Sequence, residues 1–129
     1  MAGFQSDGPC SFKAASSLSA GRVVYLSAAQ TVNYAVTSSS AILGVTLDFA
    51  DSGATVPVET RPGHIAKVYV AANVAAGDVV GPATDGAGGI TPRALGTVTS
   101  HIPTLGIALE AGSVGSNIEV LLQPVNIRA

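Results

Sequence analysis

The chain has 129 residues and a formal net charge of −2, with 47% hydrophobic and only 11% charged residues. This length suits one domain with a real core, and the apolar content excludes a chain that is disordered throughout. The six Lys and Arg residues form no basic stripe, which argues against nucleic acid as the main ligand, and no apolar run approaches the roughly 20 residues that span a bilayer.

The first nine residues contain two Gly and close on Pro9, with Phe4 as their only large side chain. We expect a flexible arm over residues 1–9, which is either a frayed terminus or a segment that orders against a partner, with Phe4 filling a pocket. The arm lacks the basic and then apolar pattern of a signal peptide, so we expect synthesis in the cytosol. Cys10 is the only cysteine, which excludes an internal disulfide and leaves a partly buried thiol or an intermolecular bridge.

Short runs of β-branched, aromatic and alternating residues predict strands along the rest of the chain. Their regular spacing and their Gly and Pro turns are typical of an all-β domain, and no stretch keeps a helical period over eleven or more residues. We expect roughly eight to ten short strands, at 11–15, 23–26, 32–36, 41–49, 55–60, 65–70, 78–80, 90–95, 104–110 and 118–123.

Several turns and breaks have clear local signals. Asp51-Ser52-Gly53 predicts a hairpin turn, and Arg61-Pro62-Gly63-His64 predicts a turn with Pro second and Gly third. Gly21 can adopt the positive φ of a tight turn. Pro57 cannot donate to a strand ladder, so we expect it at an edge or a bulge, and we expect Pro124 to end the last strand.

Two strands have faces that the alternation assigns. In the strand at 65–70, Ala66, Val68 and Val70 fall on one side. The strand at 41–49 should face the core with its large apolar residues and turn its small and polar residues away. These two sets are Leu43, Val45, Leu47 and Phe49, and Gly44, Thr46 and Asp48.

One sequence pattern occurs twice in the chain. Each copy has a small-residue turn ending in Gly before Val-Val, then a Leu-Gly-Val or Leu-Gly-Ile strand, then a short strand. Gly21 and Gly77 lie 56 residues apart, whereas Gly44 and Gly106 lie 62 apart, so the second copy carries six extra residues, which we place in the loop at 96–102. The repeat predicts a single β domain over 10–129, made of related halves at about 13–70 and 71–124. We expect an internally duplicated β-barrel or sandwich of β-tulip type with a pseudo-two-fold axis, and close backbone approach at Gly44 and Gly106 where the halves cross.

The acidic residues suggest no catalytic pair. Asp48 and Glu110 occupy equivalent places in the two copies, which duplication alone explains. A glycosidase needs two carboxylates across a cleft, and a chain with no Trp, three Tyr and three Phe offers little aromatic platform for a sugar.

Other site patterns are absent from the sequence. His64 and His101 fall in expected loops, and one Cys with two His gives no zinc spacing. There is no Gly-x-Ser-x-Gly, and the Gly-rich stretch 81–89 lacks the Lys followed by Ser or Thr of a phosphate loop. The string Ala76–Val80 (AGDVV) resembles a turn in biotinyl and lipoyl carrier domains. Such a domain needs its carrier lysine at a hairpin tip, and neither Lys13 nor Lys67 sits at one. We therefore expect no catalytic residue, no cofactor and no bound metal.

The repeated strings resemble a known family, the small capsid cement (head decoration) proteins of bacteriophages. The likeness covers about Lys13 to Gln123 and leaves out the arm and the Gly-rich loop. The matching strings are Lys13–Ala15 (KAA), Leu18–Val24 (LSAGRVV), Ile42–Leu47 (ILGVTL), Ala50–Gly53 (ADSG), Val56–Val58 (VPV), Val74–Val80 (VAAGDVV) and Leu105–Leu109 (LGIAL).

This resemblance implies a structural virion protein on the outer capsid surface, often a homotrimer, that bridges neighbouring subunits of the major capsid protein. It implies neither catalysis nor a cofactor. The low charge agrees with it, because a surface covered by partners needs little charge to stay soluble.

We expect the capsid contacts outside the repeated core, in the arm and in the tail at 125–129. The candidates are Met1, Ala2, Gly3, Phe4, Gln5, Ser6, Asp7, Gly8, Pro9 and Arg128. The main alternative is a small ligand-binding or carbohydrate-binding β module of a fibre or adhesin, and an enzyme is the weakest interpretation.

Overall fold

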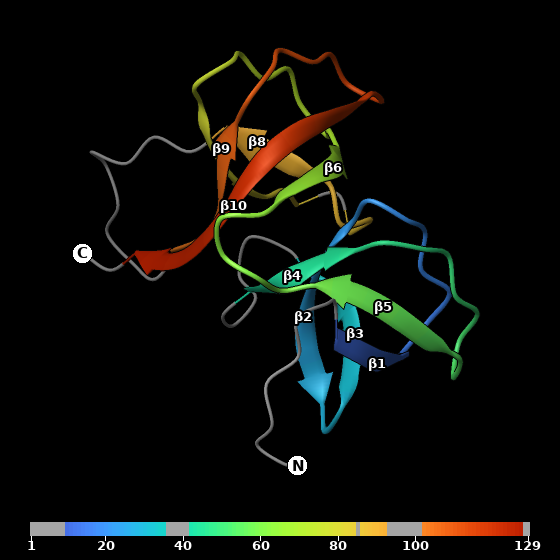
Figure 1. Cartoon of the computed structure of the whole chain (residues 1–129). Helices are drawn as coiled ribbons and strands as arrows, with labels where there is room; N and C mark the ends of the chain where they lie inside the picture. The colour runs from blue at the N-terminus through green and yellow to red at the C-terminus, as the bar shows by residue number, and fades with distance from the viewer. Residues whose placement is uncertain (1–9, 36–41, 85, 93–101, 128–129) are drawn as a thin grey trace.

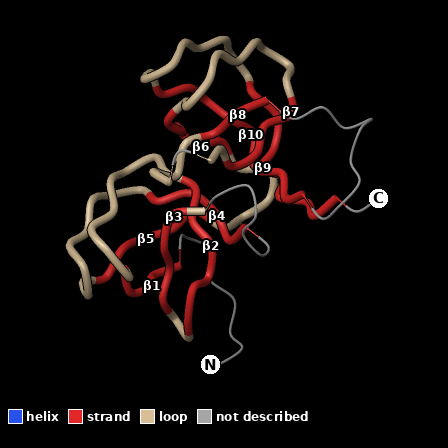
Figure 2. Tube along the Cα trace, turned by 180° about the vertical axis from the view of Figure 1, so that it is seen from behind, coloured by secondary structure: helices blue, strands red, loops and turns tan. Residues whose placement is uncertain are grey.

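The computed structural model describes residues 10–35, 42–84, 86–92 and 102–127. Over these ranges the protein is all-β, as the sequence predicts, and Figures 1 and 2 show strands joined by loops without a helix. The ten strands are β1 (Cys10–Ala14), β2 (Val23–Ala28), β3 (Thr31–Tyr34), β4 (Ile42–Thr46), β5 (Thr55–Glu59), β6 (Ile65–Tyr69), β7 (Val79–Pro82), β8 (Ile90–Pro92), β9 (Ile102–Ala108) and β10 (Asn117–Ile127).

The first five strands form a closed barrel in the order β1-β3-β2-β4-β5. β5 closes it by pairing antiparallel with β1, where Cys10 lies opposite Val58, and β1 pairs in parallel with β3. Apolar side chains fill the interior, as burial of β-branched and aliphatic groups requires. They are Ala14, Leu18, Val24, Val32, Ala50, Val56 and Val58, with Phe12, Tyr34 and Leu43 packed against them.

The last five strands form a second sheet in the order β6-β10-β9-β7-β8. A parallel bridge between Val70 and Ile90 brings the end of β6 to β8. The core of this sheet also contains Val23, Ala35, Ile42 and Val45 of the first barrel. The two groups of strands, which Figure 1 shows one above the other, are therefore packed on one another through a shared core.

The two groups repeat the same pairing, residue for residue, once the offsets of 56 and 62 are applied. Val23 pairs with Val45 between β2 and β4, and Val79 pairs with Ile107 between β7 and β9. Three other matched pairs follow these offsets: Lys13↔Thr55 and Tyr69↔Asn117, Thr46↔Val58 and Ala108↔Val120, and Leu18↔Ala50 and Val74↔Gly112. The parallel pairs Ala14↔Val32 and Val70↔Ile90 also correspond, but Val32 and Ile90 lie 58 residues apart, so two of the six extra residues precede β8 and do not lie in the loop at 96–102. The internal duplication predicted from the sequence is therefore confirmed at the level of strand register.

β6 is the counterpart of β1. It pairs with β10 as β1 pairs with β5, although the sequence repeat assigned 65–70 to the first half. We therefore propose that the two units run 10–59 and 65–127, in place of the expected halves 13–70 and 71–124.

The prediction for the strand at 41–49 is wrong at its C-terminal end. β4 stops at Thr46, and Leu47 and Phe49 are 42% and 59% exposed instead of facing the core. Within β4, Gly44 pairs with Val24 and Ile42 with Tyr25, so Leu43 is an extra residue on that side. Such a bulge shifts the alternation of faces by one residue. Ile42 and Val45 consequently share the core between the sheets, and Leu43 packs against the first barrel's interior.

The expected close approach at the two matching glycines is confirmed, but the neighbour differs. A β-carbon on Gly44 would overlap the Glu59 carbonyl oxygen of β5, and one on Gly106 would overlap the Leu121 carbonyl oxygen of β10. The approaching strand belongs in each case to the same sheet, not to the other half.

Pro57 and Pro124, the two prolines for which the sequence made a prediction, both lie within strands. Pro57 is paired with Ser11 of β1. Its carbonyl points toward β4 and accepts the Leu47 amide at 3.0 Å, just beyond the last paired residue of that ladder. The missing N–H of Pro57 therefore costs no ladder hydrogen bond. Its strand is nevertheless not an edge, because the barrel is closed. Pro124 does not end β10: the register with β9 shifts between Leu122 and Val125, and the strand continues to Ile127.

The predicted turns and the predicted face of β6 are confirmed. Gly53 and Gly63 have φ angles of 86° and 85°, the Ala54 amide donates to the Asp51 carbonyl at 2.9 Å, and the His64 amide lies 3.4 Å from the Arg61 carbonyl. Ala66, Val68 and Val70 are buried.

Candidate functional site

The predicted contact residues 1–9 and Arg128 lie outside the described residues, as do the loop at 93–101 and His101. Their roles stay predictions. The described chain begins at Cys10. Its free thiol is half-buried, in agreement with the expected partly buried thiol, and its sulfur accepts a long hydrogen bond from Thr60 Oγ1 at 3.8 Å.

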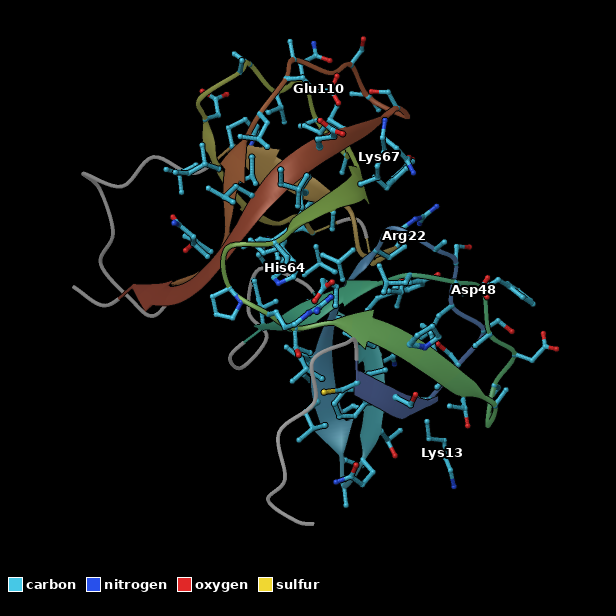
Figure 3. All side chains as sticks on the ribbon, viewed as in Figure 1. Lys13, Arg22, Asp48, His64, Lys67 and Glu110 are labelled. Carbon is cyan, nitrogen blue, oxygen red and sulfur yellow. The ribbon has the colours of Figure 1, made fainter. Side chains whose placement is uncertain are left out.

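The described residues bring together neither a cluster of metal ligands nor the two carboxylates that occupy equivalent places in the repeat. No group of three or more His, Cys, Asp or Glu side chains in these ranges could hold a metal ion. Asp48 lies on the first barrel and Glu110 on the second sheet (Figure 3). Asp48 Oδ1 accepts the Phe49 amide at 2.8 Å, and Glu110 Oε2 accepts the Glu119 amide at 2.9 Å. Among the described residues no helix has the length and apolarity that crossing a membrane requires.

One buried carboxylate sits at the link between the units. Glu59 is 6% exposed at the end of β5. Its Oε2 accepts the Arg61 Nε at 2.8 Å and its Oε1 accepts the Arg61 Nη2 at 2.8 Å. The hydrogen bond from the Arg61 side chain lowers the pKa of Glu59 and outweighs burial, which acts in the opposite direction. This pair fixes the turn into β6 and is structural.

The segment Gly21–Val23 joins the first barrel to the second sheet. The Tyr69 amide donates to the Gly21 carbonyl and the Val23 amide to the Gly88 carbonyl, both at 2.8 Å. In the first barrel the equivalent positions bond directly, from the Lys13 amide to the Gln30 carbonyl at 2.8 Å. The segment is thus inserted between β6 and β8, which explains why a single bridge remains between these strands.

Arg22 is the centre of this junction, and Figure 3 shows it between the two groups of strands. Its Nη1 donates to the Ala87 carbonyl at 2.7 Å, and its guanidinium carbon lies 4.0 Å from the centroid of the Tyr69 ring and 6.0 Å from that of Tyr34. These distances are within the cation–π range. No local pattern in the sequence indicates this role, because the residues that Arg22 contacts, Ala87 and Tyr69, lie far along the chain.

The exposed apolar surface is concentrated in two equivalent loops. We name residues 47–54, between β4 and β5, and 109–116, between β9 and β10, the twin loops. They hold four of the six large apolar side chains that are exposed in the described part of the chain. The four are Leu47 (42% exposed), Phe49 (59%), Leu109 (42%) and Val114 (62%). Single exposed apolar side chains need no explanation, but their grouping in matched loops marks a candidate contact surface.

The second twin loop borders a shallow hollow. It has a volume of about 290 Å³, is open to solvent, and is lined by Asn73, Val74, Ala111, Gly112 and Ser113. Small-molecule sites usually measure about 300–1,000 Å³ and contain aromatic side chains. The hollow has no aromatic lining and suits a single inserted side chain better than a sugar.

Comparison with known proteins gives a likeness of fold. No protein-family profile matches the chain, and no curated protein matches it. Among solved structures, it is similar to the crystal structure of the head fiber gp8.5 N base in bacteriophage phi29, with a TM-score of 0.67 over 88% of this chain and 92% of that chain. The two sequences are 17% identical. The shared feature is therefore the fold.

Proposed function

We propose that this protein is a non-enzymatic structural component of a bacteriophage head, held on the outer capsid surface by the major capsid protein. The observation that carries the proposal is the likeness to a head fibre base, which extends over nearly the whole of both chains. The resemblance of the repeated strings to capsid cement proteins supports it independently, and so does the small share of charged residues.

Within this role, we favour a decoration protein that bridges capsid subunits as a homotrimer. A protein that binds only the expanded shell stabilises that state by mass action, and weak contacts repeated around a shell add through multivalency. The arm at 1–9 and Arg128 are our candidates for the contacts. The likeness to a fibre base favours a second role, the base of a head fibre, which needs attachment but no bridging between subunits. Carbohydrate binding is a weaker proposal, because the hollow in the described part of the chain has no aromatic side chain on which a sugar could stack.

The decisive experiment uses the full chain and capsid shells, prepared without it, from the phage that encodes it. Cosedimentation with expanded and unexpanded shells should show saturable binding to expanded shells. A decoration protein that bridges subunits should also raise the temperature at which the shells fall apart, because its site exists only in the assembled shell. A fibre base that binds within a single subunit keeps its site after that subunit leaves the shell, so it should leave this temperature nearly unchanged. Absence of binding to either shell would reject both roles.

The arm is tested in the same assay. Deletion of residues 1–9 should lower shell occupancy without changing the folded core, because β1 begins at Cys10. Unchanged occupancy would remove the arm from the contact. Light scattering after size-exclusion chromatography measures whether the protein is the expected trimer.

A further inference from the structure

The twin loops are built on the same backbone. In the first, Leu18 and Ala50 exchange two hydrogen bonds of 2.8 and 2.9 Å, and in the second Val74 and Gly112 exchange two of 2.9 Å. These pairs have the same register within the two units. Because the two loops share this backbone pairing, they can be compared position by position, and what differs between them is the side chain at each position.

The main difference is a large ring on one side and a hollow on the other. Phe49, 59% exposed, precedes Ala50 in the first loop. At the equivalent place the second loop has Ala111, which lines the hollow of about 290 Å³. The next residue, Gly112, also lacks a side chain, and a β-carbon there would overlap Cγ2 of Ile118. The first loop thus presents a projecting ring where the second presents a recess.

We propose that Phe49 of one copy inserts into the hollow at Ala111 of a second copy. Insertion would bury a large exposed aromatic group, which is the kind of side chain that dominates protein interfaces. Both loops carry further exposed apolar side chains near these positions in the sequence: Leu47 lies two residues before Phe49, and Leu109 and Val114 lie two residues before and three residues after Ala111. Both loops belong to every copy, so each copy carries one projection and one recess.

The ring cannot fill the hollow of its own chain. The first twin loop belongs to the barrel and the second to the other sheet, as the labelled Asp48 and Glu110 show in Figure 3, and Phe49 remains mostly exposed. The contact is consequently heterologous, joining two different patches. Heterologous contacts close into rings when the rotation permits and otherwise form open chains. A trimer of the kind expected for the proposed function needs such a pair of patches, but the self-association itself does not require capsid binding.

The surrounding charges give the contact a definite salt dependence. Asp48 and Asp51 flank Phe49, and Glu110 precedes Ala111, all on exposed positions. Like charges that approach one another repel, and salt screens exposed charges with a Debye length of about 8 Å at physiological ionic strength. Self-association should therefore strengthen as salt is added.

Sedimentation equilibrium of the full chain over a concentration series tests the contact. Phe49→Ala and Ala111→Phe should each weaken self-association by at least about 30-fold, the effect of an interface hot spot. Leu26→Ala removes an exposed apolar side chain outside the twin loops and should leave the association constant unchanged. Melting curves should match wild type for all three, because the altered side chains are exposed.

Mixing the variants gives the sharper result. Phe49→Ala keeps the hollow and Ala111→Phe keeps the projecting ring, so an equimolar mixture should form a one-to-one dimer although neither variant associates alone. The double variant should bind neither partner. A wild-type chain that stays monomeric up to about millimolar concentration, for which the dissociation free energy is roughly 4 kcal/mol, would overturn the proposal. So would a single variant that associates like wild type, or a mixture that stays monomeric.

Shell binding separates this inference from the proposed function. If the single variants lose self-association but still sediment with expanded shells, both proposals stand. If wild type self-associates through these loops but binds no shell, the proposed function fails alone.

Discussion

At the scale of single residues, Gly106 occupies a place where only hydrogen fits. An added methyl group would overlap the Leu121 carbonyl oxygen, and this backbone oxygen belongs to β10, which is paired on both sides. We therefore expect Gly106→Ala to lower the free energy of unfolding by about 3 kcal/mol, the upper end for overpacked cores. Urea unfolding measures the loss.

Gly53→Ala is the matched control for that variant. Gly53 has a φ of 86° and nothing within 4 Å of its would-be β-carbon, so only the left-handed backbone opposes a side chain, at about 1–2 kcal/mol. Equal losses for the two variants would contradict the steric explanation for Gly106.

The ion pair of Glu59 and Arg61 makes a prediction about acid. The folded pKa of Glu59 lies below its usual value of 4.5, so the folded state binds fewer protons than the unfolded state in this range. The stabilisation from the pair is thus fully present above the unfolded pKa and is lost as the pH falls through the folded pKa.

Arg61→Gln should therefore lower the free energy of unfolding by about 1–3 kcal/mol at neutral pH, and this loss should shrink as the pH falls through the lowered folded pKa of Glu59, because protonation of the carboxyl then removes the pair in wild type as well. Urea curves at several pH values provide the measurement. Lys67→Gln, at an exposed position, is the control for loss of positive charge. A loss for Arg61→Gln that is the same at every pH would mean that packing, not the ion pair, is responsible.

At the scale of elements, the β2–β3 hairpin turns through Gln30, the one non-Gly residue with positive φ (55°) in the described part of the chain. Its counterpart in the second unit is Gly88, with φ of 75°. Since a side chain in this region is strained, Gln30→Gly should stabilise the protein by about 0.5–1 kcal/mol, whereas Ala29→Gly should destabilise it by a similar amount. Thermal unfolding of the two variants distinguishes them, and shifts of the same sign would contradict the assignment of strain to Gln30.

The sequence predicted most strands and turns but not the faces of β4. Turns follow from Gly, Pro and Asp at single positions, so Asp51–Gly53 and Arg61–His64 could be found locally. The exposure of Leu47 and Phe49 depends on where β4 ends and on the bulge at Leu43, which is set by pairing with β2. A period-two pattern contains no information about such a bulge, and the candidate surface in the twin loops was missed for this reason.

At the scale of the whole molecule, Arg22 links the first barrel to the second sheet. Its removal takes away the Ala87 hydrogen bond and the contact with Tyr69, so we expect Arg22→Ala to lower the free energy of unfolding by about 1–3 kcal/mol. Because the core between the sheets contains residues of both units, amide exchange should accelerate in β2 to β4 and in β7 to β9 together. Acceleration confined to one of the two units would contradict the shared core, and Lys13→Ala, at an exposed position, serves as the control.

The duplication was readable from the sequence, whereas the way the copies join was not. The Gly before Val-Val and the Leu-Gly strands recur at fixed offsets, because the same turns and close approaches recur. β6 shares few residue types with β1, so its place as the first strand of the second unit emerged only from its pairing with β10. The predicted contacts in the arm lie outside the described residues and remain to be tested on capsids.

The insertion of Gly21–Val23 between β6 and β8 has a consequence for the order of folding. The first barrel closes using only strands from 10–59, whereas the second sheet takes hydrogen bonds at Tyr69 and Gly88 from that finished barrel. N-terminal units generally fold first during synthesis, so the first barrel would act as a template on which the second completes itself. Pulse-labelled amide exchange during refolding should find β2 to β4 protected before β7 to β9, and the reverse order would exclude templating.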